Sequence, residues 1–203
     1  MSAPRLPKIL ITGTDGQVGF ELTRTLAPLG VIKALMRADL DLGDEDALRT
    51  LLDAEHPDII VNPAAYTAVD KAESDVAAAY AVNERAPAVM AQWAAAHGAF
   101  MVHYSTDYVF EGSGETPYVE NDAVAPQSVY GASKEKGEQA VRATLPEHFI
   151  FRTSWVFGAY GANFLKTMLR LMQERETLNV VADQIGAPTS AALLADVTAH
   201  VVR

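Results

Sequence analysis

The chain has 203 residues, 49% of them hydrophobic and 21% charged, which is enough to bury one sizeable core. It contains no cysteine, which excludes disulfides, thiolate metal sites and a thiol nucleophile. The net charge of -10 repels phosphate backbones and argues against a nucleic-acid partner. The sequence has neither an apolar run of about 18 residues nor a signal-peptide pattern over residues 1–7, so we expect a cytoplasmic protein without membrane contact.

Strands and helices are predicted to alternate along the first three quarters of the chain. Apolar, β-rich runs predict strands at 8–12, 31–36, 58–61, 100–105 and 148–153. Apolar residues at helical spacing predict helices at 18–29, 45–54, 77–97 and 129–144. This alternation predicts an α/β fold with a doubly wound, mainly parallel sheet.

Two regions interrupt the alternation. Residues 111–127 contain two glycines and two prolines and are predicted to form a long irregular loop, a feature that is often functional. Beyond residue 157, a helix is predicted at 163–176, then a turn-rich segment at 183–190 and an apolar helical pattern at 191–203. We therefore predict a nucleotide-binding domain with the catalytic residues over 1–157 and the beginning of a smaller substrate-binding lobe over 158–203.

A glycine-rich turn connects the first predicted strand to the first predicted helix. Gly13, Gly16 and Gly19 form a GxxGxxG pattern there. Glycines in such a turn let the backbone approach a pyrophosphate, whose charge the helix N-terminus stabilises. The alternative is a tight turn whose glycines serve packing only, but the flanking strand and helix favour a cofactor site.

Tyr130 and Lys134 are four residues apart, so on a helix they project from one face. A nearby ammonium would lower the pKa of the phenol and suit it to exchange a proton with a carbonyl oxygen. A solvated pair on a helix surface is the alternative. Ser105 and Thr106 favour the catalytic interpretation because they end a predicted central strand, where ligands bind in open α/β sheets. One of these two hydroxyls could instead bond its own backbone.

Several longer motifs occur in a fixed order along the chain. They are GTDGQVG at 13–19, NPAAYTAVDKAE at 62–73, YSTDYVF at 104–110, YGASK at 130–134, RTSWVF at 152–157 and DQIGAPT at 183–189. With these motifs the chain resembles the dTDP-4-dehydrorhamnose reductase family, a branch of the extended short-chain dehydrogenases, over essentially its whole length. The resemblance implies a Rossmann fold.

The resemblance also implies roles for individual residues. The cofactor would contact the glycine turn, the third strand end and the catalytic helix, through Gly13, Gly16, Gln17, Val18, Gly19, Asp41, Leu42, Ala64, Ala65, Tyr66, Tyr104, Tyr130 and Lys134. The residues themselves, rather than the resemblance, add Arg37 at the end of the second strand to the cofactor contacts. Within this set, Gly16, Gln17 and Val18 would hold the diphosphate, and Asp41 and Leu42 would lie against the adenine. Thr106, Tyr130 and Lys134 would be catalytic, while Thr106, Asp107 and Trp155 would bind the sugar; packing alone is the alternative for Trp155.

The implied reaction is the reduction of dTDP-4-dehydro-L-rhamnose to dTDP-L-rhamnose by NADPH or NADH, with rhamnose destined for a cell envelope polymer. The substrate partner would be a dTDP-4-keto-6-deoxy sugar. The resemblance also allows a magnesium ion and a homodimer, although no metal ligand set is assigned. Members of the family carry Asp where this chain has Met36, and Arg37 beside it could pair with a 2'-phosphate, so we expect NADPH to serve at least as well as NADH.

Two other functions fit the same superfamily. One is a cofactor-binding regulatory subunit like that of methionine adenosyltransferase, and the other is a sugar-nucleotide epimerase or dehydratase. An intact Thr106, Tyr130 and Lys134 argues against the first, and Tyr108 in place of a second acidic residue argues against a dehydratase. Because members of the family are longer than this chain, we expect cofactor binding with weak sugar-nucleotide turnover.

Overall fold

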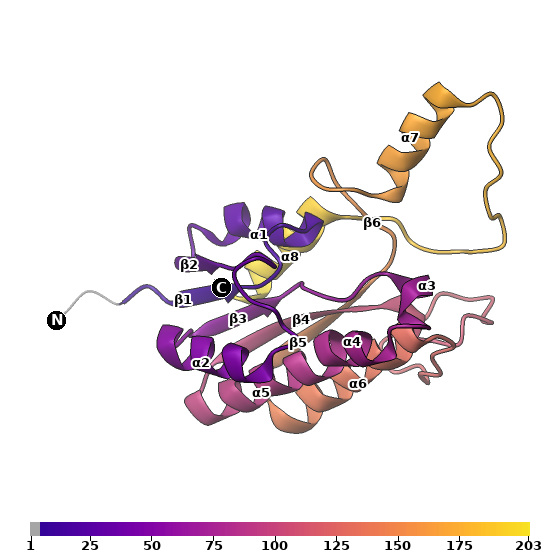
Figure 1. The fold of residues 1–203 in the computed structure, drawn as a ribbon. Helices are drawn as coiled ribbons and strands as arrows, with labels where there is room; N and C mark the ends of the chain where they lie inside the picture. The colour runs from indigo at the N-terminus through magenta and orange to yellow at the C-terminus, as the bar shows by residue number, and fades with distance from the viewer. Residues whose placement is uncertain (1–4) are drawn as a thin grey trace.

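A five-stranded parallel sheet forms the centre of the computed structural model, which describes residues 5–203; the predictions for residues 1–4 lie outside this range. The strands are β1 (Lys8–Ile11), β2 (Val31–Ala34), β3 (Ile59–Asn62), β4 (Phe100–Thr106) and β5 (His148–Thr153). Their order is β2-β1-β3-β4-β5, and every neighbouring pair is parallel (Figure 1). The predicted doubly wound α/β fold is confirmed.

Helices cover both faces of the sheet. On one face lie α1 (Gln17–Leu26) and α8 (Ala191–Val201), and on the other lie α2 (Glu45–Glu55), α5 (Ala86–His97) and α6 (Val129–Thr144) (Figure 1). Leu22 of α1 and Leu194 of α8 pack with Ile9 and Ile11 of β1 in one buried cluster. A second cluster fills the space between the sheet and α2, α5 and α6. Both faces of β3 and β4 are therefore buried, as parallel central strands require.

The helix predicted at 77–97 is confirmed, but it contains a π-helical turn that the sequence analysis did not predict. It consists of α4 (Val76–Tyr80), a π-helical turn η1 (Ala81–Arg85) and α5, and a short α3 (Val69–Ala72) precedes them. Pro87 has no N–H to bond the carbonyl of Asn83, and in a regular helix its ring would clash with that carbonyl. Gly137 of α6 packs against the same carbonyl, where a Cβ would lie 2.1 Å from the oxygen. The π turn thus lets α6 pack closely on this helix.

The last part of the chain divides between two places. β6 (Val156–Phe157) pairs with β7 (Thr189–Ser190), and between them α7 (Phe164–Glu174) projects away from the sheet (Figure 1). No residue of α7 is buried. α8, which falls within the predicted substrate-binding lobe, instead packs against α1. The lobe boundary at residue 157 stays a prediction.

The described helices include none with the length and apolar character needed to cross a membrane.

Candidate active site

The glycine turn between β1 and α1 is close-packed. Gly13 has a φ of +57°, and its carbonyl oxygen accepts a hydrogen bond of 2.9 Å from the N–H of Gly16. A Cβ on Gly19 would lie 2.1 Å from that same oxygen. Gly16 caps α1 without any side-chain hydrogen bond, so the first turn presents backbone N–H groups. This is the arrangement that binds a diphosphate at a helix N-terminus.

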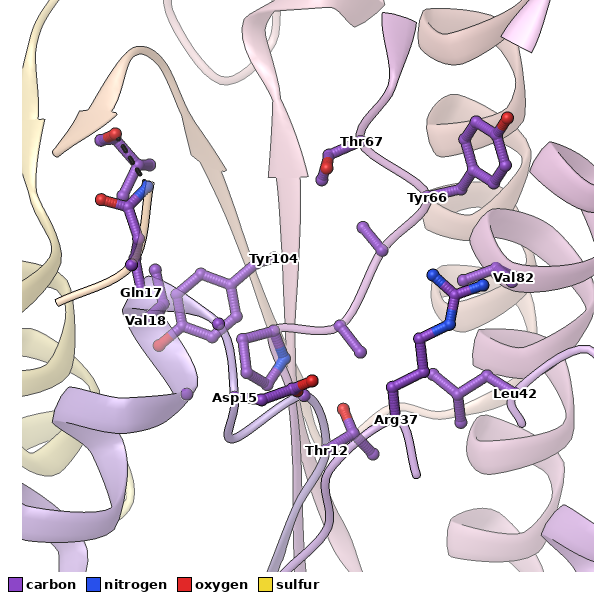
Figure 2. Close-up of a pocket in the computed structure, with 18 of the residues that line it drawn as sticks. Thr12, Asp15, Gln17, Val18, Arg37, Leu42, Tyr66, Thr67, Val82 and Tyr104 are labelled. Atoms are coloured by element: carbon purple, nitrogen blue, oxygen red, sulfur yellow. Dashed lines mark hydrogen bonds between the residues drawn. The ribbon is translucent and has the colours of Figure 1, made fainter. Parts of the chain in front are cut away.

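A cavity of about 490 Å³ opens over this turn and the carboxyl ends of the neighbouring strands. Figure 2 shows Gln17, Val18 and Tyr104 on one side of it, and Arg37, Leu42 and Tyr66 on the other. All the residues predicted to contact the cofactor line this one cavity: Gly13, Gly16, Gln17, Val18, Gly19, Arg37, Asp41, Leu42, Ala64, Ala65, Tyr66, Tyr104, Tyr130 and Lys134. The structure therefore brings together residues that span more than half of the chain.

The side chain of Gln17 bonds β6 and the segment that follows it. Its Nε2 donates to the carbonyl of Val156 over 3.2 Å, and its Oε1 accepts from Asn163 Nδ2 over 2.9 Å. Asn163 also caps α7 by accepting from the N–H of Lys166 at 2.9 Å. The side chain of Gln17 thus links the glycine turn to the start of α7. Asn163 was not predicted as a site residue.

Asn83 is a second residue that sequence analysis missed. Its Oδ1 accepts from the N–H of Tyr66 at 2.8 Å, and its Nδ2 donates to the carbonyl of Tyr66 at 3.1 Å and to Ser133 Oγ at 3.0 Å. These bonds fix the segment after β3, which forms one wall of the cavity, to α6. In the sequence, Asn83 stands in an alanine-rich stretch, and only Pro87 four residues later signals an irregularity.

Lys134 is buried in α6, and its Nζ donates to the carbonyl of Tyr104 over 2.6 Å. Burial lowers the pKa of Lys134 to about 8, and the charge of Glu138 opposes this shift. Burial raises the pKa of Tyr130 to about 12, with the hydroxyl of Thr106 opposing the rise and Asp107 adding to it. The expectation that Lys134 lowers the pKa of Tyr130 is wrong for this structure, because burial raises that pKa and the Lys134 ammonium bonds the Tyr104 carbonyl. Tyr130 is a neutral phenol at neutral pH.

The three residues predicted to bind the sugar lie outside the lining of the cavity. Thr106 ends β4, and its Oγ1 donates to Asp107 Oδ1 over 3.1 Å. Asp107 Oδ2 accepts from Ser154 Oγ over 2.7 Å, which connects the ends of β4 and β5. Trp155 is 48% exposed and has a φ of +46°, so it is not a packed core residue. An exposed aromatic held in a strained conformation is typical of functional sites.

Arg37 and Met36 follow β2 at the far end of the cavity. Figure 2 shows the guanidinium of Arg37 extending toward Val82 and Tyr66. Asp39 accepts a hydrogen bond of 2.8 Å from the N–H of Met36 and so belongs to the turn itself. A cation thus reaches into the cavity where a ribose-binding carboxylate is usual.

Within residues 5–203 no group of three or more His, Asp or Glu side chains could hold a metal ion. The magnesium allowed by the family resemblance therefore receives no support from the structure.

Comparison with known proteins identifies the family. The model of the family described as the RmlD substrate binding domain matches residues 7–203. A dTDP-4-dehydrorhamnose reductase of Burkholderia thailandensis is 54% identical over 193 residues, which are 95% of this chain and 65% of that protein. The chain thus spans about two thirds of the length of that relative.

Two solved structures of reductases with that name share the fold closely. The one from Clostridium acetobutylicum has a TM-score of 0.92 and 42% identity, and the match covers 96% of this chain and 70% of that one. The one from Bacillus anthracis, solved in complex with NADP, has a TM-score of 0.91 and 41% identity over 97% of this chain and 70% of that one. On this evidence, and with a cavity built by the expected motifs, the chain belongs to the RmlD substrate binding domain family.

Proposed function

We propose that this chain is an oxidoreductase that uses NADPH to reduce the C4 keto group of dTDP-4-dehydro-L-rhamnose, giving dTDP-L-rhamnose. The observation that carries the proposal is that Tyr130, Lys134 and the glycine turn line one cavity. The 54% identity to a dTDP-4-dehydrorhamnose reductase supports the choice of substrate.

The cavity fits a nicotinamide dinucleotide. The close approach of Gly19 to Gly13 leaves the turn open to a diphosphate, which the N–H groups of α1 would bind. Asp41 and Leu42 would lie against the adenine, and the wall held by Asn83 would border the middle of the cofactor. When bound, the cofactor supplies the hydride.

The cofactor preference follows from Arg37. Its planar guanidinium can form paired hydrogen bonds with a 2'-phosphate, whereas residues 35–37, directly after β2, include no carboxylate, and that of Asp39 bonds the N–H of Met36. NADPH is therefore expected to bind at least as well as NADH. The related structure that holds NADP is consistent with this preference.

Tyr130 is suited to donate the proton that the reduced carbonyl oxygen needs. Its raised pKa keeps the phenol protonated at neutral pH, and the alkoxide that develops at C4 is a stronger base than the phenolate. Thr106 would bond the same oxygen as negative charge develops on it, because its hydroxyl lies beside Tyr130. Lys134, as a cation, would bind the ribose hydroxyls of the cofactor. Asp107 and Trp155, at the ends of β4 and β5, would orient the sugar.

Incubating the protein with NADPH and the 4-keto sugar nucleotide tests the proposal. A reductase consumes NADPH only when the sugar is present, and the absorbance of NADPH falls. A regulatory subunit would bind the cofactor without consuming it, and an epimerase would alter the sugar without net loss of NADPH. Either of these results, with a protein shown to be folded, would replace the proposed function.

We also propose that residues 158–203 contribute to a substrate-binding lobe, and that the enzyme works in the cytoplasm as a homodimer. Asn163 supports the lobe assignment because it joins the start of α7 to the glycine turn. Light scattering tests the dimer, and a monomer at micromolar concentration would exclude it.

A further inference from the structure

Glu138 is a buried carboxylate that the proposed mechanism does not use. It lies on α6 four residues after Lys134, so both side chains project from the same face of the helix. Its side chain has no exposure to solvent. Arg152 of β5 donates to it twice, from Nε to Oε1 over 2.9 Å and from Nη2 to Oε2 over 2.7 Å, and Arg142 donates to Oε2 over 2.7 Å.

Arg152 is itself fixed from the opposite side. Its guanidinium lies 4.8 Å from the centre of the Phe110 ring, which stacks on Tyr118 with centroids 4.2 Å apart. Its Nη1 also donates to the carbonyl of Glu120 over 3.4 Å. A guanidinium held by both a carboxylate and an aromatic ring has little freedom to rotate. Arg152 therefore keeps Glu138 ionised and directed toward the interior of the fold.

Glu138 is the negative charge that favours the ammonium form of Lys134. The other polar groups near Lys134 are neutral or act elsewhere. From β4 comes His103, which burial and the charge of Lys134 hold neutral by lowering its pKa, and from η1 comes the neutral amide of Asn83. On α6, Tyr130 is a neutral phenol, and Asp107 of the short 3-10 helix η2 (Asp107–Val109) acts on that phenol.

Glu135 is the other buried acid of α6. It accepts a hydrogen bond from Gln139, and its charge acts on Arg152; as the next residue after Lys134 it points to a different side of the helix from the ammonium.

We propose that Glu138, locked by Arg152, is a positioning residue that keeps Lys134 charged in its buried place. Desolvation favours the neutral amine of Lys134, and the Glu138 carboxylate favours the ammonium. Without that carboxylate, the charge of Arg152, whose side chain is only 18% exposed, would be left without its buried partner and would further disfavour the ammonium. The importance of this charge for binding the cofactor's ribose rests on the proposed function, whereas the effect on Lys134 itself does not.

Carbon-13 NMR titration of the lysine ε-carbons tests the inference on the protein without cofactor. The Lys134 signal is assigned by its loss in Lys134→Arg. We expect Glu138→Gln to move the titration midpoint of Lys134 to lower pH by roughly one unit. Glu135→Gln is the matched control, the same substitution on the same helix, and should leave the midpoint unchanged. Glu138→Asp retains the negative charge, so its Lys134 titration midpoint should lie close to that of the wild type.

An unchanged Lys134 midpoint in Glu138→Gln, or an equal shift in Glu135→Gln, would overturn the inference. If Glu138→Gln does not fold, because its arginines are left unpaired, the double variant Glu138→Gln with Arg152→Met removes both buried charges. A shift in the same direction is then expected, and its absence overturns the inference as well.

NADPH titrations of the same variants add a second measurement. In the unmodified protein, affinity should decline as pH rises above about 8, and in Glu138→Gln this decline should begin at lower pH. If the NMR midpoints shift as expected but no variant binds NADPH, the proposed function fails and the role of Glu138 stands. If NADPH binds but the pH at which its affinity declines does not shift with the Lys134 titration midpoint, the role of Lys134 toward the ribose is refuted.

Discussion

Replacing Gly19 with alanine should disrupt the cofactor site through one steric contact. The added Cβ would lie 2.1 Å from the carbonyl oxygen of Gly13 and 2.8 Å from the Cα of Thr14, whereas ordinary contact begins at about 3.4 Å. Both neighbours are backbone atoms, so the turn must move by more than an ångström. Overpacking of this kind costs about 1–3 kcal/mol, which corresponds to a loss of NADPH affinity of roughly fivefold to 150-fold.

Two other glycines provide controls for Gly19→Ala. A Cβ on Gly16 would lie 3.2 Å from the Gly13 oxygen, so Gly16→Ala needs a shift of only a few tenths of an ångström and should weaken binding less. A Cβ on Gly30 would lie 2.3 Å from the carbonyl oxygen of Pro7, and Gly30 does not line the cavity. Gly30→Ala should therefore lower the melting temperature without changing the NADPH affinity of the folded protein.

The assay combines thermal unfolding with calorimetric titration of NADPH at a temperature at which every variant is folded. The reasoning predicts that affinity falls in the order wild type, Gly16→Ala, Gly19→Ala. It is refuted if Gly19→Ala binds NADPH as tightly as the wild type, or if Gly30→Ala loses as much affinity as Gly19→Ala while still folded.

Three further predictions concern side chains of the cavity. Tyr130→Phe should reduce turnover by on the order of a hundredfold or more while NADPH binding stays within a few-fold, because the phenol acts on the sugar carbonyl; near-normal turnover would contradict its role as proton donor. Lys134→Ala should weaken NADPH binding and also lower turnover, which calorimetric titration and steady-state kinetics measure separately. A loss of only NADPH affinity or only turnover would contradict this double role. Arg37→Ala should weaken NADPH binding but not NADH binding, so unchanged affinities for both cofactors would show that Arg37 does not discriminate.

The arrangement of the sheet could be predicted because its signals are local. Each central strand is a short apolar run followed by a glycine turn or a polar cluster, and the carboxyl ends of parallel strands meet at one edge. Gly13 and Ala64 follow β1 and β3, and Thr106 ends β4, so the topology places all three at one edge of the sheet. The cavity could be foreseen for the same reason.

Other features depend on contacts that a single sequence does not reveal. The π turn at Asn83 arises from Pro87 together with the close packing of Gly137, a residue 54 positions away in another helix. The direction of the pKa shift of Tyr130 depends on burial and on where the Lys134 ammonium points, and helical spacing alone predicted the wrong sign. The charged cluster of Glu138 and Arg152 joins a helix to a strand, and neither residue stands out in its own segment.

The proposed reaction transfers a hydride to C4 of the sugar, and tracing that hydrogen tests it most directly. The protein, in excess, is incubated with dTDP-4-dehydro-L-rhamnose and NADPH that carries deuterium on the transferred position, and the sugar nucleotide is analysed by mass spectrometry and NMR. A single turnover is sufficient for detection, so slow reaction does not obscure the result. We predict dTDP-L-rhamnose with deuterium at C4, formed by the wild type and at least a hundredfold more slowly by Tyr130→Phe. Unlabelled sugar after prolonged incubation with protein that binds NADPH would contradict the assignment of this chain as a reductase.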